Sequence, residues 1–423
     1  MSYVLVLNKN KKDPLNKNLK SYLCPYDSEV VHKVVSEIDL YFNDFSAYLV
    51  DNEGAKLKTP STHCSEANSA WSTVQFLASE VIIKTDPLSQ CPLWYANTKD
   101  KIVIGLEKKS MQFFIGLDHI QRLSQGSLLR LNLNSKTITS ENENKIPWIN
   151  FQVNQALSLN EAQLKLSHVL MSSAAAIPRS ETASFLSGGI DSSVATALFK
   201  KNITCSYNLT THLGDEKKQS EETSKFLSIP CRSIKLAQDE IDSNLKSVVS
   251  ANELTDGLTA EILLQLNKLV QHTREAQIIT GYGADLLFGG MLRHKAYLEA
   301  TGTHDTASLL SRTHWSQEFS PFYYWQYRKR MFHLFWHPDV IAMALTIPAD
   351  LQFDGAVEKI VLRSMAVKLN LLTHDLAYRP KLGMTNGTQV NAMLSNSLGL
   401  SSENEYAKKT SEVMKQFKGI FFE

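Results

Sequence analysis

The sequence predicts an α/β protein in which a sheet-rich N-terminal domain precedes a doubly wound parallel sheet with a helical C-terminal part. Three observations support this prediction: short alternating apolar stretches in the first third, strand-like runs that alternate with helical stretches after it, and two glycine-rich turns that each follow a predicted strand. Strands that alternate with helices form parallel sheets, which bind ligands at the carboxyl ends of their strands. We therefore expect a ligand site at the two turns.

The first domain is expected to cover residues 1–150. Its predicted strands are short stretches in which apolar and polar residues alternate. They occupy residues 4–7, 47–50, 102–106 and 127–133. A polar segment that ends in proline, residues 140–147, is the predicted linker to a second domain, residues 151–423.

The second domain is predicted because the pattern of apolar residues changes after the linker. Apolar runs with strand character alternate with stretches of helical periodicity. Strands are expected at residues 183–186, 203–209, 231–236 and 276–280, helices at 161–175 and 192–200, and a mainly helical region from about residue 300. This alternation is the basis for the doubly wound sheet.

Composition excludes several classes of protein. Lys plus Arg number 44 and Asp plus Glu number 43, so no excess of charge indicates a nucleic-acid or anionic-membrane partner. No run approaches the roughly 20 apolar residues of a membrane-spanning helix. Five cysteines without close pairing favour the reduced thiols of a cytoplasmic enzyme. We expect a homo-oligomer that acts on a small molecule.

The first glycine-rich turn has the composition of a phosphate-binding loop. It places two glycines and three serine hydroxyls between a predicted strand and a predicted helix, where main-chain N–H groups and hydroxyls can bind phosphate oxygens. Asp191 would repel phosphate unless Mg²⁺ lies between them. The predicted nucleotide-binding residues are Leu186, Ser187, Gly188, Gly189, Asp191 and Ser192. An ordinary serine/glycine turn, with Asp191 favouring the helix dipole, is the alternative.

The string Ser-Gly-Gly-Ile-Asp-Ser at residues 187–192 resembles the pyrophosphatase loop of the ATP-pyrophosphatase superfamily. This resemblance implies that ATP is cleaved between its α- and β-phosphates and that AMP is passed to the substrate. A Walker-type loop would end in Gly-Lys-Ser or Gly-Lys-Thr, and that ending does not occur at this site.

The second turn, residues 280–290, reads Thr-Gly-Tyr-Gly-Ala-Asp-Leu-Leu-Phe-Gly-Gly and resembles the second ATP/Mg²⁺ loop of the asparagine synthetase family. The resemblance places Gly281 at the nucleotide and pairs Asp285 with Asp191 as magnesium ligands. Tyr282 stands where asparagine synthetases have Glu. A tyrosine at this position is typical of the β-lactam synthetase and carbapenam synthetase branch.

Three further segments resemble that branch, at residues 252–261, 312–319 and 378–383. Their resemblance implies catalytic roles for Tyr282, Glu318 and Lys381. A phenol with a pKa of about 10 is a weak base alone, but a neighbouring carboxylate can orient it and accept its proton. Lys381 would provide positive charge where the tetrahedral intermediate and the departing AMP develop negative charge.

The N-terminal domain resembles the remnant glutaminase (Ntn-type) domain of this family only in segments 91–95 and 123–129. A working glutaminase of this class carries Cys after the initiator Met, where this chain has Ser2. We therefore expect neither glutamine hydrolysis nor ammonia delivery, and a structural role for the domain.

The resulting hypothesis is an ATP- and Mg²⁺-dependent ligase that adenylates a β-amino acid and closes its own amine onto the carbonyl. The products would be a β-lactam, AMP and pyrophosphate, in the biosynthesis of a β-lactam natural product. The alternatives are an intermolecular or macrocyclic amide ligase of the peptide-cyclase kind and a non-catalytic nucleotide-binding protein. Arg328 and Arg330 are candidates for contact with an acidic substrate group, or else surface charges.

Overall fold

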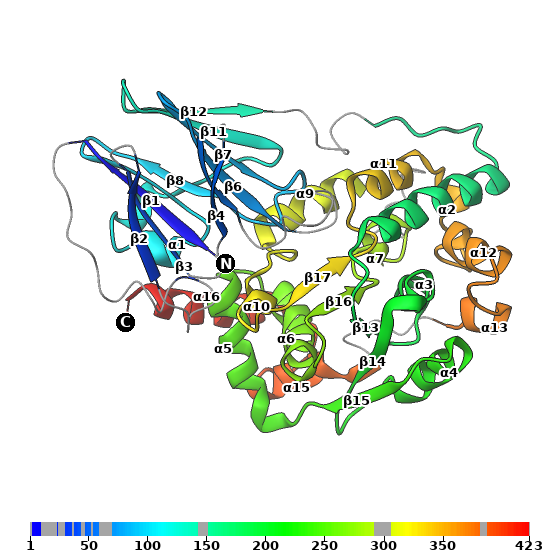
Figure 1. Cartoon of the computed structure of the whole chain (residues 1–423). Helices are drawn as coiled ribbons and strands as arrows, with labels where there is room; N and C mark the ends of the chain where they lie inside the picture. Colours follow the sequence, from blue (N-terminus) through cyan, green and yellow to red (C-terminus); the bar gives the residue numbers. More distant parts are fainter. Residues whose placement is uncertain are drawn as a thin grey trace.

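The computed structural model describes residues 2–9, 23, 30–35, 38–43, 47–51, 54–58, 70–142, 151–291, 306–380 and 387–422. Figure 1 shows the N-terminal strands gathered on one side of the molecule and a parallel sheet with helices around it on the other. Within these residues, none of the helices has both the length and the hydrophobicity that a membrane crossing requires.

The N-terminal part consists of two antiparallel sheets, each with six strands in the described residues, in the orders β10-β8-β9-β1-β3-β2 and β12-β11-β7-β6-β5-β4. The first sheet contains β1 (Tyr3–Asn8), β2 (Val30–Val35), β3 (Ile38–Asn43), β8 (Trp94–Asn97), β9 (Lys101–Gly105) and β10 (Gln121–Arg122). The second contains β4 (Ala47–Asp51), β5 (Gly54–Lys58), β6 (Ser72–Phe76), β7 (Glu80–Thr85), β11 (Ser127–Asn132) and β12 (Thr137–Asn142).

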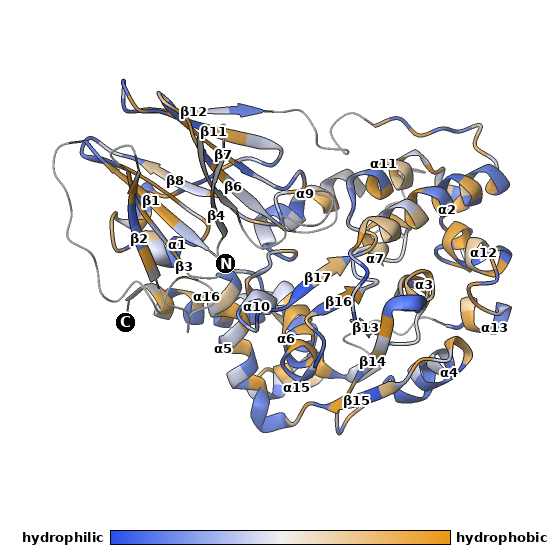
Figure 2. Ribbon diagram, viewed as in Figure 1, coloured by the Kyte–Doolittle hydropathy of each residue, from blue (hydrophilic) through white to orange (hydrophobic). Residues whose placement is uncertain are grey.

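The two antiparallel sheets share a core because alternate residues of their strands face inward. Burial alternates along β6 and β7, and Leu5 of the first sheet belongs to the same apolar cluster as Val74 and Ile83 of the second. β12 lies at the edge of its sheet and is mostly exposed, and Figure 2 shows its hydrophilic character.

The four predicted N-terminal strands correspond to β1, β4, β9 and β11, so these predictions are confirmed. The predicted linker is partly wrong, because residues 140–142 form the end of β12 and pair with β11. The alternation of this exposed strand is weak, since most of its residues face water. The remainder of the predicted linker, residues 143–147, lies outside the described residues.

The second part is built on a parallel sheet in the order β15-β14-β13-β16-β17, and all of its strand pairs are parallel. Its strands are β13 (Thr182–Phe185), β14 (Ile203–Thr210), β15 (Cys231–Lys235), β16 (Gln277–Thr280) and β17 (Arg330–His333). The α/β class with a parallel sheet is thereby confirmed. β17 was not predicted, because its four residues are an edge strand that pairing with β16 stabilises.

Helices cover both faces of the parallel sheet. Its main helices are α2 (Leu159–Ala176), α3 (Ile190–Leu198), α4 (Lys217–Leu227), α5 (Ile241–Asn252), α6 (Gly257–His272), α9 (Thr306–Ser316), α11 (Pro338–Thr346), α12 (Ile360–Lys368), α15 (Val390–Ser397) and α16 (Tyr406–Phe422). Three single-turn helices described in this part are α7 (Ala284–Leu287), α10 (Phe322–Trp325) and α13 (His374–Ala377), and a further one, α1 (Lys108–Met111), belongs to the N-terminal part. The helical character predicted from about residue 300 is confirmed, with β17 as the exception.

The two faces are distinguished by adjacent residues of β13. Ser184 is hydrogen-bonded at 2.5 Å to Thr196 of α3, whereas Phe185 points the other way into the apolar cluster that contains Leu263 of α6. Because successive strand residues face opposite sides, α3 and α6 cover opposite faces. This is the doubly wound arrangement that the alternating sequence predicts.

Candidate active site

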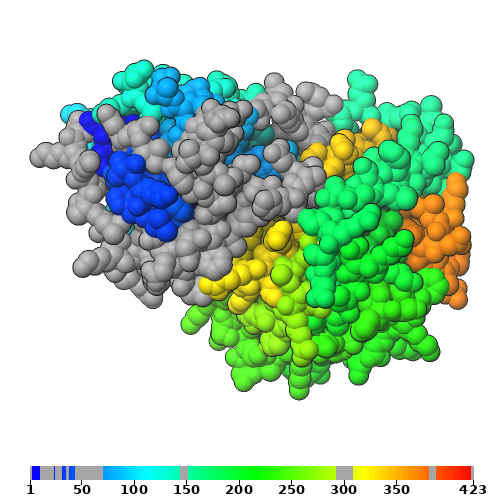
Figure 3. Space-filling view, viewed as in Figure 1, coloured from blue at the N-terminus to red at the C-terminus, as the bar shows by residue number. Residues whose placement is uncertain are grey.

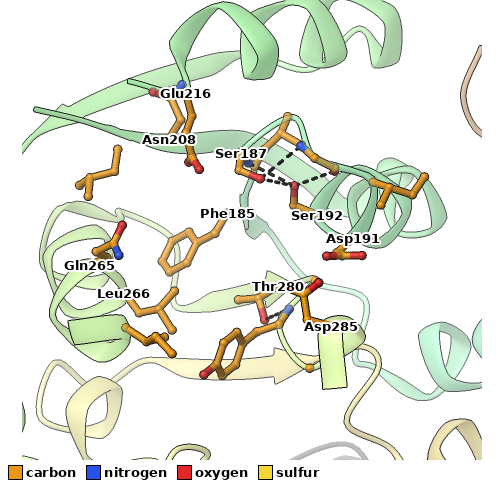
Figure 4. A pocket seen from close by; sticks show the side chains of 18 of the residues that line it. Phe185, Ser187, Asp191, Ser192, Asn208, Glu216, Gln265, Leu266, Thr280 and Asp285 are labelled. Atoms are coloured by element: carbon orange, nitrogen blue, oxygen red, sulfur yellow. Dashed lines mark hydrogen bonds between the residues drawn. The ribbon is translucent and has the colours of Figure 1, made fainter. Parts of the chain in front are cut away.

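A cavity lies where the parallel sheet reverses its strand order. β13 is flanked by β14 and β16, and the chain leaves β13 and β16 in different directions, so a crevice remains at their carboxyl ends. The cavity has a volume of about 1240 Å³, including its open mouth, and both glycine-rich loops line it. Figure 4 shows side chains of both loops, among them Ser187 and Asp285, at this cavity.

Most of the residues predicted from sequence line this one cavity. They are Leu186, Ser187, Gly189, Asp191, Ser192, Gly281, Tyr282, Asp285 and Glu318. Gly188 is not part of the lining, although it shapes the first loop. Lys381 lies outside the described residues, so its position relative to the cavity stays a prediction.

The first loop is closed by its own serines. The Ser187 main-chain N–H donates to Ser192 Oγ at 3.2 Å, and the two hydroxyls are 3.0 Å apart. Gly188 has a φ of 81°, and a Cβ there would lie 2.6 Å from the carbonyl oxygen of Gln219. Helix α3 follows with no side-chain cap at Gly189. Its first N–H groups are therefore available to an anion.

The second loop lies directly against the first. A Cβ at Gly281 would be 2.5 Å from the main-chain nitrogen of Ser192 and closer still to the main chain of Asp191, so only glycine permits this contact. Gly283, with a φ of 97°, precedes α7, which carries Asp285 in its first turn. The two loops thus bring Asp191 and Asp285 together from separate strands.

A buried lysine that the sequence analysis missed joins the two aspartates. Lys359 Nζ lies 2.5 Å from Asp191 Oδ2 and 2.5 Å from Asp285 Oδ1. Its side chain is 1% exposed, whereas those of Asp191 and Asp285 are 21% and 41% exposed. Burial by itself would lower the pKa of Lys359, but the two carboxylates outweigh burial and raise that pKa above its ordinary value. No motif signalled Lys359, because it approaches the loops from the start of α12.

The position of the Lys359 ammonium group between the two carboxylates indicates whether a divalent cation fits between Asp191 and Asp285. Since both oxygens lie 2.5 Å from the same nitrogen atom, Asp191 and Asp285 can bind a common cation. Mg²⁺ typically takes one or two carboxylates and completes its shell with water and phosphate oxygens. Within the described part of the chain, no cluster of three or more His, Cys, Asp or Glu side chains forms a metal site. The residues present therefore fit a phosphate-bound Mg²⁺ better than a protein-enclosed metal.

The partly buried Tyr282 and the buried Glu318 form a hydrogen-bonded pair beside these loops. The Tyr282 hydroxyl donates a hydrogen bond to Glu318 Oε1, and the Tyr282 ring packs 5.1 Å from the Phe319 ring, centroid to centroid. Burial, together with the charge of Glu318, raises the pKa of Tyr282 well above its ordinary value. Burial also raises the pKa of Glu318, whereas the hydrogen bond from Tyr282 and the charge of Arg312 oppose that rise. In this pair Tyr282 keeps its proton and Glu318 accepts the hydrogen bond.

Behind this pair, His333 supports the second loop as a neutral group. His333 Nδ1 is 2.7 Å from Thr280 Oγ1, and this hydroxyl oxygen accepts from the Tyr282 main-chain N–H at 3.3 Å. Burial lowers the pKa of His333 to about 3. At neutral pH the imidazole is therefore uncharged and adds no positive charge beside Tyr282.

Three buried polar side chains occupy another part of the cavity lining, and the sequence analysis missed them. They are Asn208 of β14, Glu216 before α4 and Gln265 of α6, which Figure 4 labels. In the described residues, Asn208 Oδ1 and Gln265 Nε2 are buried without a hydrogen-bond partner. Burial raises the pKa of Glu216 to about 8. Such atoms are suited to hydrogen bonding with a polar group of a ligand. No sequence motif could have identified these residues, because they come from three separate parts of the chain.

Arg328 and Arg330 do not reach the cavity. Both side chains are exposed, and neither is among the residues that line the site. Two other arginines do line it, Arg363 and Arg379. Arg379 lies at the first loop, where it donates to the Gln219 carbonyl at 3.0 Å. Of the two interpretations of Arg328 and Arg330, the structure favours surface charge.

The chain matches known proteins over this region. Residues 174–332 match the family described as asparagine synthase. The chain is 24% identical over 376 residues to the carboxyethyl-arginine β-lactam-synthase of Streptomyces clavuligerus, which covers 83% of this chain and 71% of that protein. With the two loops and the cavity, these matches define an ATP-dependent amide-forming ligase. The resemblance of the chain to the asparagine synthetase family, and to its β-lactam synthetase branch, is confirmed.

Solved structures were also matched. NMN synthetase from Francisella tularensis is 13% identical, covers 63% of this chain and 96% of its own, and has a TM-score of 0.26. Glutamine phosphoribosylpyrophosphate amidotransferase from B. subtilis, complexed with ADP and GMP, is 9% identical, covers 66% of this chain and 81% of its own, and has a TM-score of 0.24.

Proposed function

We propose that this ligase closes an amide within one substrate molecule: a β-amino acid is adenylated at its carboxylate and then cyclised by its own amine to a β-lactam. The observation that carries the proposal is the hydrogen-bonded Tyr282–Glu318 pair, which lies beside the two nucleotide loops and lines the same cavity. Similarity to a β-lactam-synthase supports the same class of reaction. AMP and pyrophosphate would be the other products.

The nucleotide-binding role rests on the first loop. The uncapped start of α3, the Ser187 and Ser192 hydroxyls and the close contact at Gly281 provide donors around one small space, as phosphate recognition requires. Asp191 and Asp285 would hold Mg²⁺, which would neutralise charge on the phosphates. Lys359, already beside both carboxylates, would add positive charge at the same place.

The Tyr282–Glu318 pair would act as the general base. Ring closure requires the substrate amine to lose a proton as it attacks the activated carbonyl. In the resting pair, Tyr282 keeps its proton and Glu318 accepts the hydrogen bond, so the carboxylate has the capacity to take one more proton. A positioned base of this kind contributes about 10²–10⁴-fold. Lys381 is proposed to stabilise the oxyanion, on its resemblance alone.

The division of the chain belongs to the same proposal. Residues 1–150 would be a degenerate glutaminase-like (Ntn-type) domain and residues 151–423 the ATP-pyrophosphatase domain. Ser2 supports this view, because its hydroxyl is buried and donates to Glu107, an arrangement that suits structure better than nucleophilic catalysis. Cys91, Cys205 and Cys231 are free thiols, which suits a cytoplasmic enzyme. A homo-oligomer acting on a small amino acid completes the proposal.

The test is a reaction with defined substrates. The protein would be incubated with ATP, Mg²⁺ and a panel of β-amino acids that includes carboxyethyl-arginine, carboxymethyl-proline and an open-chain tabtoxinine-type precursor. Mass spectrometry would follow both nucleotide and amino acid. AMP, pyrophosphate and a product lighter by one water would support ring closure. AMP with product only when a second amine is added would favour the intermolecular ligase, and ATP binding without any turnover would favour a non-catalytic protein.

A further inference from the structure

The N-terminal sheets contact the second part of the chain beside the Tyr282–Glu318 pair. In Figure 3 the yellow segment that includes α9 lies along the boundary between the two parts. Arg122 of β10 donates a hydrogen bond across this boundary to the carbonyl of His314, in α9. Glu318 follows two residues after α9 ends. The N-terminal part is therefore attached to the segment that leads into Glu318.

Lys109 makes the second and more deeply buried attachment. This residue of α1 is 2% exposed, an unusual environment for a lysine. Its Nζ lies 3.1 Å from Glu107 Oε1 and donates to the carbonyl oxygen of Ser250 at 2.6 Å. Its main-chain N–H donates to Glu253 Oε1 at 2.8 Å. The Lys109 side chain thus holds the last turn of α5, and its main chain holds Glu253, the residue that ends this helix.

The held residue, Glu253, is bonded in turn to the segment before Glu318. Gln317 Nε2 donates to the Glu253 carbonyl oxygen at 3.1 Å. Glu253 and Gln317 have φ values of 53° and 58°, so both adopt a left-handed conformation that non-glycine residues seldom occupy without support. Asn252 adds to this support, since its Nδ2 donates to the Ser320 carbonyl oxygen at 3.0 Å. A continuous set of contacts therefore joins α1 to the turn that carries Glu318.

We propose that Lys109 is a positioning residue for ring closure: its ammonium group anchors the end of α5 at the Ser250 carbonyl. From the end of α5, Glu253 and Gln317 extend this anchor to the left-handed turn that orients the Glu318 carboxylate toward Tyr282. This inference rests on the proposed function. It gives the N-terminal part a role in the second half-reaction, whereas adenylation would take place at the nucleotide loops, to which none of the Lys109 partners named above belongs. A displacement of about 1 Å at a reacting group can cost about 10²-fold in rate.

The test compares the variant Lys109→Met with the wild-type chain in two measurements. This variant removes the Nζ contacts with Ser250 and Glu107 and keeps the main-chain hydrogen bond to Glu253. Hydrogen exchange followed by mass spectrometry would report the main-chain amides of residues 317–325, where the Tyr323 N–H is bonded to Asn252 Oδ1 at 2.9 Å. We expect at least about tenfold faster exchange in that segment. Amide formation should fall at least about tenfold in kcat, while ATP–pyrophosphate exchange and the KM for ATP stay within about threefold of wild type, because the nucleotide loops are intact.

Lys409→Met is the matched control. Lys409 is also a buried lysine in an ion pair, 2.6 Å from Glu261 Oε2, but it joins α16 to α6, and its ammonium group donates its other hydrogen bond to the Glu403 carbonyl oxygen at 2.7 Å. It should leave exchange in residues 317–325 and the ratio of amide to AMP unchanged. If Lys109→Met fails to fold, Gln317→Gly serves instead, since glycine adopts the left-handed backbone freely. This variant removes the bond to the Glu253 carbonyl and the 3.5 Å contact with the Ser320 hydroxyl.

Two outcomes overturn the inference. Unchanged exchange in residues 317–325 would show that Lys109 does not hold the turn, whatever substrate the enzyme uses. Equal loss of pyrophosphate exchange and amide formation would show a general structural role. Absence of AMP formation by the wild-type chain would count against the proposed function instead, and the hydrogen-exchange comparison would still decide whether Lys109 holds the turn.

Discussion

Replacing Lys359 by methionine tests whether the two aspartates form the magnesium site. The substitution keeps the volume of the side chain and removes its charge, so Asp191 and Asp285 lose the ammonium group 2.5 Å from each. Breaking a fully buried pair costs about 3–5 kcal/mol. Because the aspartates are 21% and 41% exposed, water screens the remaining repulsion, and we expect a loss of about 2–3 kcal/mol.

This loss should be visible in thermal unfolding. At about 2 °C per kcal/mol for a chain of this size, Lys359→Met should lower the melting temperature by about 4–6 °C in metal-free buffer. Added Mg²⁺ should restore part of the loss, since a cation then returns to the carboxylates. About 10 mM Mg²⁺ acting on a site with a Kd of about 1 mM stabilises by about 1.4 kcal/mol, or roughly 3 °C.

The magnesium-dependent rise in melting temperature, compared between Lys359→Met and the wild-type chain, decides whether Asp191 and Asp285 bind the metal. In the wild-type chain Lys359 competes with the cation, so the same Mg²⁺ addition should raise the melting temperature less. The control Lys409→Met, which breaks the buried pair with Glu261, should lower the melting temperature without any gain in magnesium response. A magnesium shift in Lys359→Met no larger than in the wild-type chain and this control would refute the assignment of Asp191 and Asp285 to the metal.

Three further predictions follow from the site. Burial raises the pKa of Glu216 to about 8, so the cost of ionising this buried carboxyl group destabilises the folded chain increasingly between about pH 4.5 and pH 8. Glu216→Gln removes this cost and should stabilise the chain increasingly over the same interval, as melting temperatures from pH 5 to 9 would show. Gly281→Ala places a Cβ against the main chain of Asp191 and Ser192 and should abolish ATP binding measured by calorimetry, an outcome contradicted by wild-type affinity. Tyr282→Phe and Lys381→Ala should each retain ATP binding and lose the dehydrated product; near-normal turnover of both would remove the proposed mechanism and leave the fold intact.

The sequence alone determined the features that depend on neighbouring residues. A short apolar run followed by glycines and serines at residues 183–193 specifies strand, loop and helix locally, because glycine supplies the positive φ at Gly188 and the start of a helix leaves N–H groups without an intrahelical partner. The same holds for the second loop. Since the carboxyl ends of parallel strands meet at one edge of the sheet, the sequence also predicted a ligand site at the two turns, and the resemblance to asparagine synthetases paired Asp191 with Asp285 there.

Only the tertiary structure decided which distant residues complete that site. Lys359 adopts a left-handed conformation ahead of α12 and reaches both aspartates from there, and no periodicity or motif encodes such a contact. No periodicity or motif encodes the contact between Lys109 and Glu253 either, since Lys109 lies in α1 and Glu253 ends α5. These side chains are charged, and sequence patterns assign charged residues to the surface by default. Their burial is possible because the fold brings opposite charges within hydrogen-bonding distance, which is a property of the packed chain and not of any segment.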